Sequence, residues 1–347
     1  MTDRAPLDSL DARALAPYLE QHVAGFKGPF QAEKFAGGQS NPTFKLTARS
    51  GVYVLRRQPP GALLKSAHAV DREYRVTRAL ADTGVPVARV FHLCEDPAVI
   101  GSLFYVMEYC DGNVYWGAAL PEARDGQQRA AMYDEMNRVL AALHQVDVEA
   151  VGLADFGRPS HYFDRQWQRW SAQYAASALA PVAAMDELMA QLPRFMPPDD
   201  GKVALVHGDY RLDNLMFSHD NSRIIAVLDW ELSTLGHPYA DLAYQCMQMR
   251  LPHSSDRTSM SGLLGLDRRS LGIPSEADYV ARYCQRMGIA HIDHWQFYLA
   301  FSFFRLAAIA QGVAKRASQG NASNQRAAAA GAMVAPLAQA ALACLNE

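Results

Sequence analysis

The segment LVHGDYRLDNLMF, residues 205–217, places a polar run between two apolar runs. The apolar runs are typical of short buried strands, so the polar residues form a loop at the edge of a core, where catalytic side chains often lie. Asp209 and Asn214 lie at the two ends of this loop, and Asp229 follows the next apolar run, in VLDWE. Carboxylate and amide oxygens are ligands that Mg²⁺ prefers, together with water and phosphate oxygens. A carboxylate that stays off the metal can instead orient a hydroxyl and accept its proton.

Three further polar residues in this region have both a functional and a structural interpretation. We interpret His207, taken alone, as a hydrogen-bonded loop histidine rather than a catalyst. Arg211 is either a surface ion pair or a contact to a transferred phosphate. Asp241, in GHPYADLAY, is interpreted as a residue that caps or braces a helix.

HGDYRLDN followed by VLDWE resembles the aminoglycoside phosphotransferase and choline-kinase-like branch of the protein-kinase-like fold. In that family His-Gly-Asp-x-x-x-x-Asn takes the place of the kinase catalytic loop, and a later aspartate takes the place of the metal-binding aspartate. The resemblance implies that Asp209 is the catalytic base, that Asn214 and Asp229 bind Mg²⁺, and that His207 is structural. It also implies ATP as the phosphoryl donor. Arg211 is a second-rank catalytic candidate because of its place inside the loop.

The N-terminal third of the chain contains the remaining parts that this resemblance implies, in the same order. FAGGQSNPTFKL, residues 35–46, resembles the glycine-containing hairpin that covers ATP phosphates, although it is not a G-x-G-x-x-G motif. Glu73 resembles the glutamate that orients the phosphate-binding cation, and VMEYC, residues 106–110, resembles the hinge that pairs with adenine. The implied nucleotide-binding residues are Gly37, Gly38, Gln39, Ser40, Arg56, Glu73, Met107, Glu108 and Cys110.

The chain departs from the family pattern where a lysine is usual on the third strand, because VYVLRRQPPG offers Arg56 and Arg57 instead. Arginine is still a cation, but its guanidinium is a planar fork and not a compact ammonium group. Side chains alternate along a strand, so only one of the two faces the nucleotide, and register with the family favours Arg56. The VLRRQPPG run also resembles the kinase-like domain fused to acyl-CoA dehydrogenases in animals, which favours a substrate other than an antibiotic.

The elements that must position these residues form an α+β protein of two lobes, with the protein-kinase-like fold that the resemblance implies. The first lobe, residues 1–110, is predicted to contain an antiparallel sheet, with a hairpin turning at Ser50 and Gly51. It also contains one helix, over residues 66–84, whose apolar stripe includes Glu73.

The second lobe, residues 111–347, is predicted to be mostly helical. The exception is the block 203–228, where VALV, NLMF and IIAVL are typical of short strands around the polar loop. The alanine-rich helix at the end of the chain is predicted to be interrupted by Gly331 and Pro336.

Composition sets limits on the partners and the compartment. Half of the 347 residues are hydrophobic, and the formal net charge of −3 gives no global reason to expect nucleic acid or an anionic membrane as partner. Five scattered cysteines without a C-x-x-C pair indicate neither a disulfide framework nor a zinc site, and they fit the cytoplasm. The N-terminus lacks the apolar region of a secretory signal. The apolar stretch FYLAFSFFRLAAIAQGVAK carries Arg305 and Gln311, so it is interpreted as a buried helix.

The function that we predict is an ATP- and Mg²⁺-dependent transfer of the γ-phosphoryl group to the hydroxyl of a small molecule. Residues 250–272 carry an excess of positive charge, which suits an anionic or neutral acceptor but equally fits a solvated surface. The charged residues of this stretch are Arg250, Arg257, Arg268 and Arg269 against Asp256 and Asp267. Together with the VLRRQPPG resemblance, they favour a hydroxyacyl-CoA over an aminoglycoside as the acceptor.

Two other function classes remain open from the sequence. A metallohydrolase could use His207, Asp209, Asp229 and His237 as ligands for zinc or manganese, but it would leave the glycine hairpin and Glu73 without a role. A nucleotide-binding pseudokinase without turnover is the stronger alternative, because an arginine replaces the usual lysine. ATP consumption separates the kinase from the hydrolase, and ATP binding without ADP formation would indicate the pseudokinase.

Overall fold

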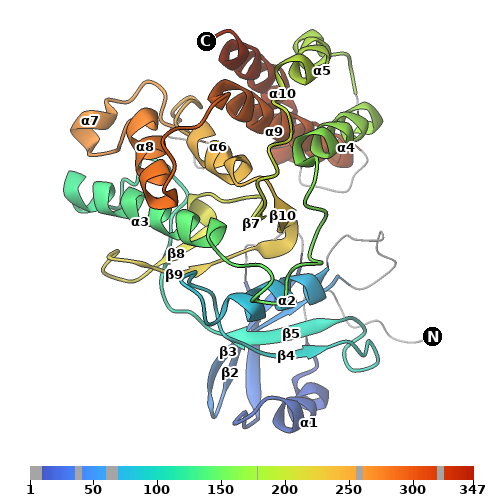
Figure 1. Ribbon diagram of the computed structural model, residues 1–347. Coiled ribbons are helices and arrows are strands. Elements are labelled where there is room, and N and C mark those ends of the chain that lie inside the picture. The colour runs from blue at the N-terminus through green and yellow to red at the C-terminus, as the bar shows by residue number, and fades with distance from the viewer. Residues whose placement is uncertain (1–9, 36–40, 60–68, 178, 255–260, 319–323) are drawn as a thin grey trace.

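The computed structural model describes residues 10–35, 41–59, 69–177, 179–254, 261–318 and 324–347. A strand-rich part with the N-terminal helices lies at the bottom of Figure 1, and a larger helical part lies above it. The α+β class predicted from the sequence is confirmed.

Five antiparallel strands form the main sheet in the order β1-β2-β3-β5-β4. Their bounds are Phe30–Lys34 (β1), Thr43–Ala48 (β2), Gly51–Arg57 (β3), Val90–Cys94 (β4) and Phe104–Glu108 (β5). The β2–β3 hairpin forms as predicted, but Ala48 pairs with Gly51. The turn therefore consists of residues 49 and 50, one position earlier than predicted.

One face of this pleated sheet packs into the core of the lobe. Phe44, Leu46 and Leu55 are buried on this face with Leu15 and Leu19 of helix α1 (Ala12–His22), in one apolar cluster. Because successive side chains of a strand point to opposite faces, the residues between them lie on the other side of the sheet.

The other face of the sheet is polar where α2 (Val70–Leu80) covers it. Thr43, Arg56 and Tyr105 stand opposite one another in the strand register. Helix α2 packs against β4 and β5, and its Glu73 reaches the Tyr105 hydroxyl. The sheet and the helix therefore bring a buried carboxylate next to Arg56.

Helix α2 is shorter than the predicted range of 66–84. Residues 66–68 lie outside the described part of the chain, and the helix ends at Leu80. The Thr83 hydroxyl donates to the Leu80 carbonyl at 2.8 Å, and the Val85 N–H donates to the Thr83 hydroxyl at 3.2 Å. This side-chain hydrogen bond satisfies a terminal carbonyl and stops the helix before Gly84.

Helices make up most of the rest of the chain. They are α3 (Gly126–His144), α4 (Tyr162–Ser177), α5 (Ala183–Phe195), α6 (Tyr239–Met247), α7 (Arg268–Leu271), α8 (Glu276–Met287), α9 (Trp295–Ser318) and α10 (Asn324–Leu345). Helix α9 contacts α4, α5, α6 and α10. It is long and apolar enough to cross a membrane, but 89% of its most apolar window is buried inside the protein, as expected for the predicted buried helix.

Helix α10 runs through Gly331 and Pro336, so the predicted interruption is wrong. Its main contact is with α9, and a Cβ at Gly331 would lie 3.2 Å from the Cβ of Ala314 on that helix. Close packing of two helices over this length outweighs the weak helix propensity of single residues.

Two small sheets position the polar loop. Strands β7 (Ala204–Val206) and β10 (Thr234–Gly236) form one, and β6 (Asn113–Val114), β8 (Leu215–Phe217) and β9 (Ile224–Val227) form the other. The 3-10 turns η1 (Leu212–Asn214) and η2 (Trp230–Leu232) precede β8 and β10. The three strands predicted in the block 203–228 are therefore confirmed as β7, β8 and β9, and the loop lies between the first two.

Buried apolar side chains form two clusters. One lies within residues 15–106, and the other extends from Val76 and Leu80 of α2 to Leu345 of α10. Helix α2 therefore contributes to the larger cluster although it precedes residue 110. The predicted lobe boundary at residue 110 stays a prediction.

Candidate active site

The Asp209 carboxylate is held in place but remains accessible. Asn214 Nδ2 donates to this carboxylate at 3.0 Å and to the Asp209 carbonyl at 2.8 Å. Arg211 Nε lies 3.4 Å from the same carboxylate oxygen, Oδ2. The Asp209 side chain keeps 21% of its surface exposed, so a ligand can reach a carboxylate whose orientation is already fixed.

Asp241 fixes the backbone that leads to Asp209. Its carboxylate accepts the N–H of His207 at 2.6 Å and the N–H of Gly208 at 2.8 Å. Burial alone would raise the pKa of Asp241, but His144 and His207 outweigh burial, so this pKa lies below its usual range. Asp241 lies in the first turn of α6, yet it braces the polar loop, which the sequence interpretation as a helix brace missed.

His207 joins the polar loop to the chain after β9. Its Nε2 lies 2.8 Å from the Leu228 carbonyl, and its Nδ1 lies 3.2 Å from the Asp209 N–H. A carbonyl only accepts and an N–H only donates, so the ring is the neutral tautomer with its proton on Nε2. Both ring nitrogens are therefore used inside the fold, where His207 is fully buried.

Asn214 and Asp229 each present an oxygen suited to a hard cation. Because Asn214 Nδ2 faces two acceptors on Asp209, Asn214 Oδ1 must point the other way. Asp229 has φ 61° and ψ 64°, the left-handed conformation, and only its Oδ1 contacts Arg56. Within the described part of the chain, Asn214 Oδ1 and Asp229 Oδ2 have no protein partner. Two such donors fit Mg²⁺, which keeps water and phosphate oxygens as its other ligands.

Arg56 on β3 connects the sheet to this pair. Its Nε lies 2.7 Å from Glu73 on α2, and its Nη2 lies 2.8 Å from Asp229, a residue 173 positions later in the chain. Burial lowers the pKa of Arg56, but Glu73, Tyr105 and Asp229 outweigh burial, so this pKa rises above its usual value. A planar guanidinium can reach two carboxylates at once, which explains how an arginine serves at this position.

Glu73 is only 2% exposed, and donors surround its carboxylate. Asn41 Nδ2 donates to it at 2.7 Å, and the Tyr105 hydroxyl donates to it at 3.3 Å. Burial raises the pKa of Glu73 and Arg56 opposes the rise, with a net increase. Burial and then Glu73 raise the pKa of Tyr105. The sequence prediction missed both donors, although Tyr105 lies two strand residues before Met107 and so shares its face.

Arg57 points to the opposite face of the sheet. Its Nε donates to the Ser102 hydroxyl at 3.0 Å, and its Nη2 donates to the Ile100 carbonyl at 3.0 Å. Strand alternation therefore places Arg56, and not Arg57, beside Glu73.

Arg211 forms its ion pairs within the polar loop. Its Nη2 lies 2.8 Å from Asp213, in addition to the Asp209 contact of its Nε. Burial raises the pKa of Asp213, although Arg211 opposes the rise. A contact from Arg211 to a transferred phosphate stays a prediction.

The residues predicted to bind adenine lie at the end of β5. Met107 lies on the face of the sheet that carries Arg56. The Glu108 N–H donates to the Arg89 carbonyl at 2.8 Å, and the Arg89 N–H donates to the Glu108 carboxylate at 3.3 Å. Cys110 follows two residues after the strand, and burial raises the pKa of its thiol to about 11. The predicted phosphate-covering residues Gly37, Gly38, Gln39 and Ser40 lie outside the described residues.

The described arginines of the stretch 250–272 do not gather at one acceptor wall. Arg250 lies 2.6 Å from Glu276 and 2.6 Å from Glu347, so its charge is already matched. Arg268 and Arg269 line a groove of about 920 Å³ between α3, α7 and α8. Arg257 and Asp256 lie outside the described residues.

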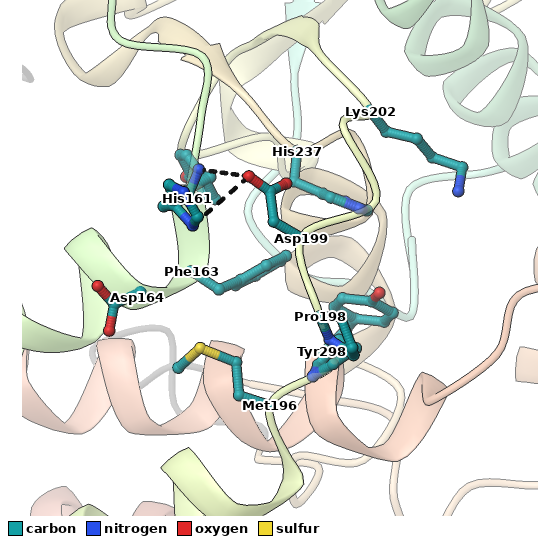
Figure 2. Close-up of a pocket in the computed structure, with 11 residues that line it drawn as sticks. His161, Phe163, Asp164, Met196, Pro198, Asp199, Lys202, His237 and Tyr298 are labelled. Atoms are coloured by element: carbon teal, nitrogen blue, oxygen red, sulfur yellow. Dashed lines mark hydrogen bonds and ion pairs between the residues drawn. The ribbon is translucent and has the colours of Figure 1, made fainter.

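A cavity of about 100 Å³ lies beside His237 (Figure 2). Asp199 contacts His161 at its edge, whereas His237 stacks on Tyr298 and lies 3.3 Å from Asp200. Gly236 pairs with the first residue of β7, so this cavity lies at the end of β7 opposite to the polar loop.

The ligand set of the metallohydrolase alternative is not brought together. That set is His207, Asp209, Asp229 and His237, and the last of these lies at the other end of β7. Within the described ranges, no three His, Cys, Asp or Glu side chains lie close enough to hold a metal ion. The structure therefore does not favour a zinc or manganese hydrolase.

Arg305 of α9 also reaches the polar loop, where its guanidinium donates to the Gly208 carbonyl. In the sequence, this residue served only as evidence against a membrane span. A charged residue inside an apolar helix was nevertheless a signal, because a buried charge requires polar partners.

Comparisons with known proteins identify the family of the chain. Residues 31–272, more than half of the chain, match the phosphotransferase enzyme family. The chain is 45% identical over 326 residues to acyl-CoA dehydrogenase family member 10 of Mus musculus, and 40% identical over 342 residues to acyl-CoA dehydrogenase family member 11 of Rattus norvegicus. The matches cover 92% and 97% of this chain but 30% and 43% of those relatives, so the chain spans less than half of their length.

Solved structures show the same fold. One is a protein of Ralstonia eutropha JMP134 that is assigned to the aminoglycoside phosphotransferases. It is 48% identical to this chain, with a TM-score of 0.88, and the match covers 97% of this chain and 99% of that chain. Spectinomycin phosphotransferase, solved with ADP and spectinomycin, is 12% identical, with a TM-score of 0.64 and the same coverage. At that identity the likeness concerns the fold alone. The predicted two-lobed, kinase-like fold is confirmed.

Proposed function

The chain belongs to the phosphotransferase enzyme family, and we propose that it transfers the γ-phosphoryl group of ATP to a hydroxyl of a small molecule. The observation that carries this proposal is that two groups of polar residues lie on adjoining segments. Asn214 donates to Asp209, and Asp229 pairs with Arg56 beside Glu73. The Leu228 N–H donates to the Asn214 carbonyl at 2.8 Å, which joins the segment before Asp229 to the polar loop. The two groups supply the parts that a phosphoryl transfer requires: a base, metal ligands and a fixed cation.

Asp209 is the proposed base. The acceptor hydroxyl oxygen attacks the γ-phosphorus while the bond from that phosphorus to the β–γ bridging oxygen breaks and ADP leaves. The hydroxyl proton passes to the Asp209 carboxylate, which Asn214 Nδ2 orients. Mg²⁺ bound to Asn214 Oδ1 and Asp229 would supply neutralisation of the phosphate charge.

Two arginines are the proposed cations at the phosphates. Arg56 is fixed by Glu73, and its contact with Asp229 places its charge beside the proposed metal ligands. Arg211 lies 3.4 Å from the Asp209 carboxylate. Fixed charges at these positions stabilise the negative charge of the transferring group without reorganisation during the reaction.

We propose that adenine binds at the end of β5. The Glu108 N–H is used by Arg89, which leaves the Glu108 carbonyl and the Cys110 N–H for the adenine edge. Met107 then contacts the ring, because its side chain lies on the face of the sheet that carries Arg56. The phosphates extend along that face, with residues 37–40 as their proposed cover.

We propose a hydroxyacyl-CoA as the acceptor, with an aminoglycoside as the less favoured class. The relatives named acyl-CoA dehydrogenase family members 10 and 11 support an acyl thioester.

The test is to incubate the protein with Mg-ATP and, separately, with a panel of hydroxyacyl-CoAs and a panel of aminoglycosides. Mass spectrometry should find a phosphorylated acyl-CoA, and the Asp209→Asn variant should not produce it. A phosphorylated aminoglycoside without a phosphorylated acyl-CoA would overturn the acceptor but leave the kinase reaction standing. ATP binding without ADP formation in the presence of either panel would instead support the pseudokinase alternative.

A further inference from the structure

Arg305 occupies a position in the active site that the reaction described above does not require. It comes from the middle of α9, 97 residues after Gly208, and it is 8% exposed. We propose that Arg305 is a positioning residue for Asp209, which it acts on through the peptide group between Gly208 and Asp209. This inference rests on the proposed role of Asp209 as the base.

The guanidinium of Arg305 lies over the rings of two aromatic side chains. It is 5.0 Å from the ring centroid of Tyr244 on α6 and 5.5 Å from that of Trp170 on α4. No carboxylate among the described residues lies within ion-pairing distance of it. A buried charge of this kind is costly, and an apolar side chain would fill the same space at a lower cost. The charge is therefore better explained by its contact with the Gly208 carbonyl than by the packing of α9.

This contact completes a set of charged partners around one peptide segment. On one side, Asp241 accepts the N–H groups of His207 and Gly208. On the other side, Arg305 donates to the Gly208 carbonyl. Charge-assisted hydrogen bonds are about twice as strong as neutral ones. The peptide groups on the two sides of Gly208 are thus held by opposite charges, the one before it by Asp241 and the one that leads to Asp209 by Arg305.

The backbone freedom of Gly208 explains why the hydrogen bonds of Asp241 and Arg305 are needed there. Its φ is +82°, and a Cβ there would lie 2.6 Å from the Leu232 carbonyl, so the site requires glycine. Glycine also has the most backbone freedom of any residue, and a rotation at Gly208 would swing the Asp209 carboxylate away from the acceptor hydroxyl. A misplacement of about 1 Å can cost about a hundredfold in rate. Arg305 limits this rotation.

The test compares Arg305→Met, Arg305→Lys and the control Arg129→Met. Arg129 is a matched arginine in α3 that also donates to backbone carbonyls, those of Ala119 and Leu120, but away from the polar loop. Arg305→Met should lower kcat by about tenfold to a hundredfold while the KM for ATP changes by less than about twofold. Arg305→Lys keeps the charge and should recover part of kcat, and Arg129→Met should leave both constants close to wild type.

Hydrogen–deuterium exchange of the segment 204–214 gives a readout that does not depend on turnover. Exchange there should be faster in Arg305→Met than in wild type, intermediate in Arg305→Lys and unchanged in Arg129→Met. If wild type phosphorylates no acceptor, the proposed function fails, but the exchange data still decide whether Arg305 holds the loop.

Three outcomes would overturn the proposal. The first is a folded Arg305→Met variant with the kcat and loop exchange of wild type. The second is an equal loss of kcat in Arg129→Met, which would indicate a general loss of structure. The third applies if Arg305→Met does not fold, and it comes from Arg305→Lys. A lysine lacks the planar guanidinium, so wild-type exchange and kcat in Arg305→Lys would exclude a positioning role for that group.

Discussion

At the residue scale, the surroundings of Asp209 allow a substitution that removes its charge and keeps its shape. Asn214 and Arg211 both contact one oxygen of the carboxylate, and about a fifth of the side chain stays accessible. An asparagine keeps the size of the group but cannot accept the hydroxyl proton. The substitution Asp209→Asn therefore isolates the proposed base from the packing of the loop.

We expect Asp209→Asn to lower kcat by about 10² to 10⁴, with ATP affinity close to wild type. Steady-state kinetics and calorimetric ATP titration measure the two effects. Asp220→Asn, in the exposed turn between β8 and β9, is the control and should leave both values unchanged. Full turnover of Asp209→Asn with the natural acceptor would require another base.

Arg56 is also a residue whose loss should be measurable in the fold itself. Glu73 is 2% exposed, and Arg56→Ala would leave this carboxylate buried without its cation. We expect the free energy of unfolding to fall by about 3 kcal/mol, and ATP binding to weaken as well. The Glu73 contact accounts for most of this change, because Asp229 is 38% exposed and solvent screens its charge.

The control for Arg56→Ala is Arg75→Ala. Arg75 also pairs with an aspartate, Asp155, but both side chains are exposed, so the loss should stay within about 0.5 kcal/mol. Urea unfolding of the two variants measures the difference. Equal and small losses in both would show that the buried pair contributes nothing beyond an exposed one.

At the element scale, the junction of β10 and α6 carries a histidine that should make stability depend on pH. His237 lies beside the cavity of Figure 2, and burial lowers its pKa to about 4, although Asp200 opposes this effect and Lys202 adds to it. The unfolded chain takes up a proton at His237 near pH 6.5, whereas the folded protein does not until about pH 4. The stability contributed by neutral His237 is therefore full above pH 6.5 and is lost as the pH falls toward 4.

We expect this histidine to account for about 3 kcal/mol of lost stability between pH 7 and pH 4, as an upper estimate. Urea unfolding at a series of pH values should show a steeper decline for wild type than for His237→Gln, which cannot take up a proton. The two curves should converge at low pH. Parallel curves over the whole range would mean that His237 is not held neutral by burial.

Helix α2 is the element that links the sheet to the rest of the molecule. Its Arg72 donates to the carbonyls of Phe156 and Ser233, and its Glu73 anchors Arg56. The apolar stripe predicted this helix, but the stripe alone gave no reason for a glutamate inside it. The reason is Arg56, the buried cation that Glu73 meets on the face of the sheet that α2 covers.

At the scale of the whole molecule, the proposed nucleotide site draws on residues from both parts of the chain. Mg²⁺ and ATP together should therefore stabilise the fold. At concentrations about a hundredfold above the dissociation constant, the gain should be roughly 2.7 kcal/mol. Thermal melting with ATP alone, Mg²⁺ alone and both together measures the gain.

Asp229→Ala should remove most of the Mg²⁺-dependent part of this stabilisation while ATP alone still binds. The control is Ser233→Ala, four residues after Asp229, because Ser233 is not one of the two proposed metal ligands. A wild-type melting curve that does not move at saturating Mg-ATP would contradict a nucleotide site in this protein.

The sequence by itself determined the class of fold and the chemistry of the polar loop. Asp209 and Asn214 lie within one strand-loop-strand unit, and short-range patterns of apolar and polar residues were sufficient to predict β7, β8 and β9 around them. Strand alternation showed that only one of Arg56 and Arg57 faces the nucleotide, and register with the resembled family favoured Arg56. These inferences succeeded because each depends on the periodicity of one element or on neighbours a few residues apart.

Only the tertiary structure decided which distant residues meet at that loop. The Arg56–Asp229 contact spans 173 positions, and the contacts that Asp241 and Arg305 make with Gly208 span 33 and 97 positions. No local period encodes such pairs, because they arise when helices and sheets pack to bury their apolar faces. The same packing explains why α10 continues through Gly331 and Pro336. Short segments of the sequence thus specify the polar groups, whereas the burial of the core determines which distant groups they contact.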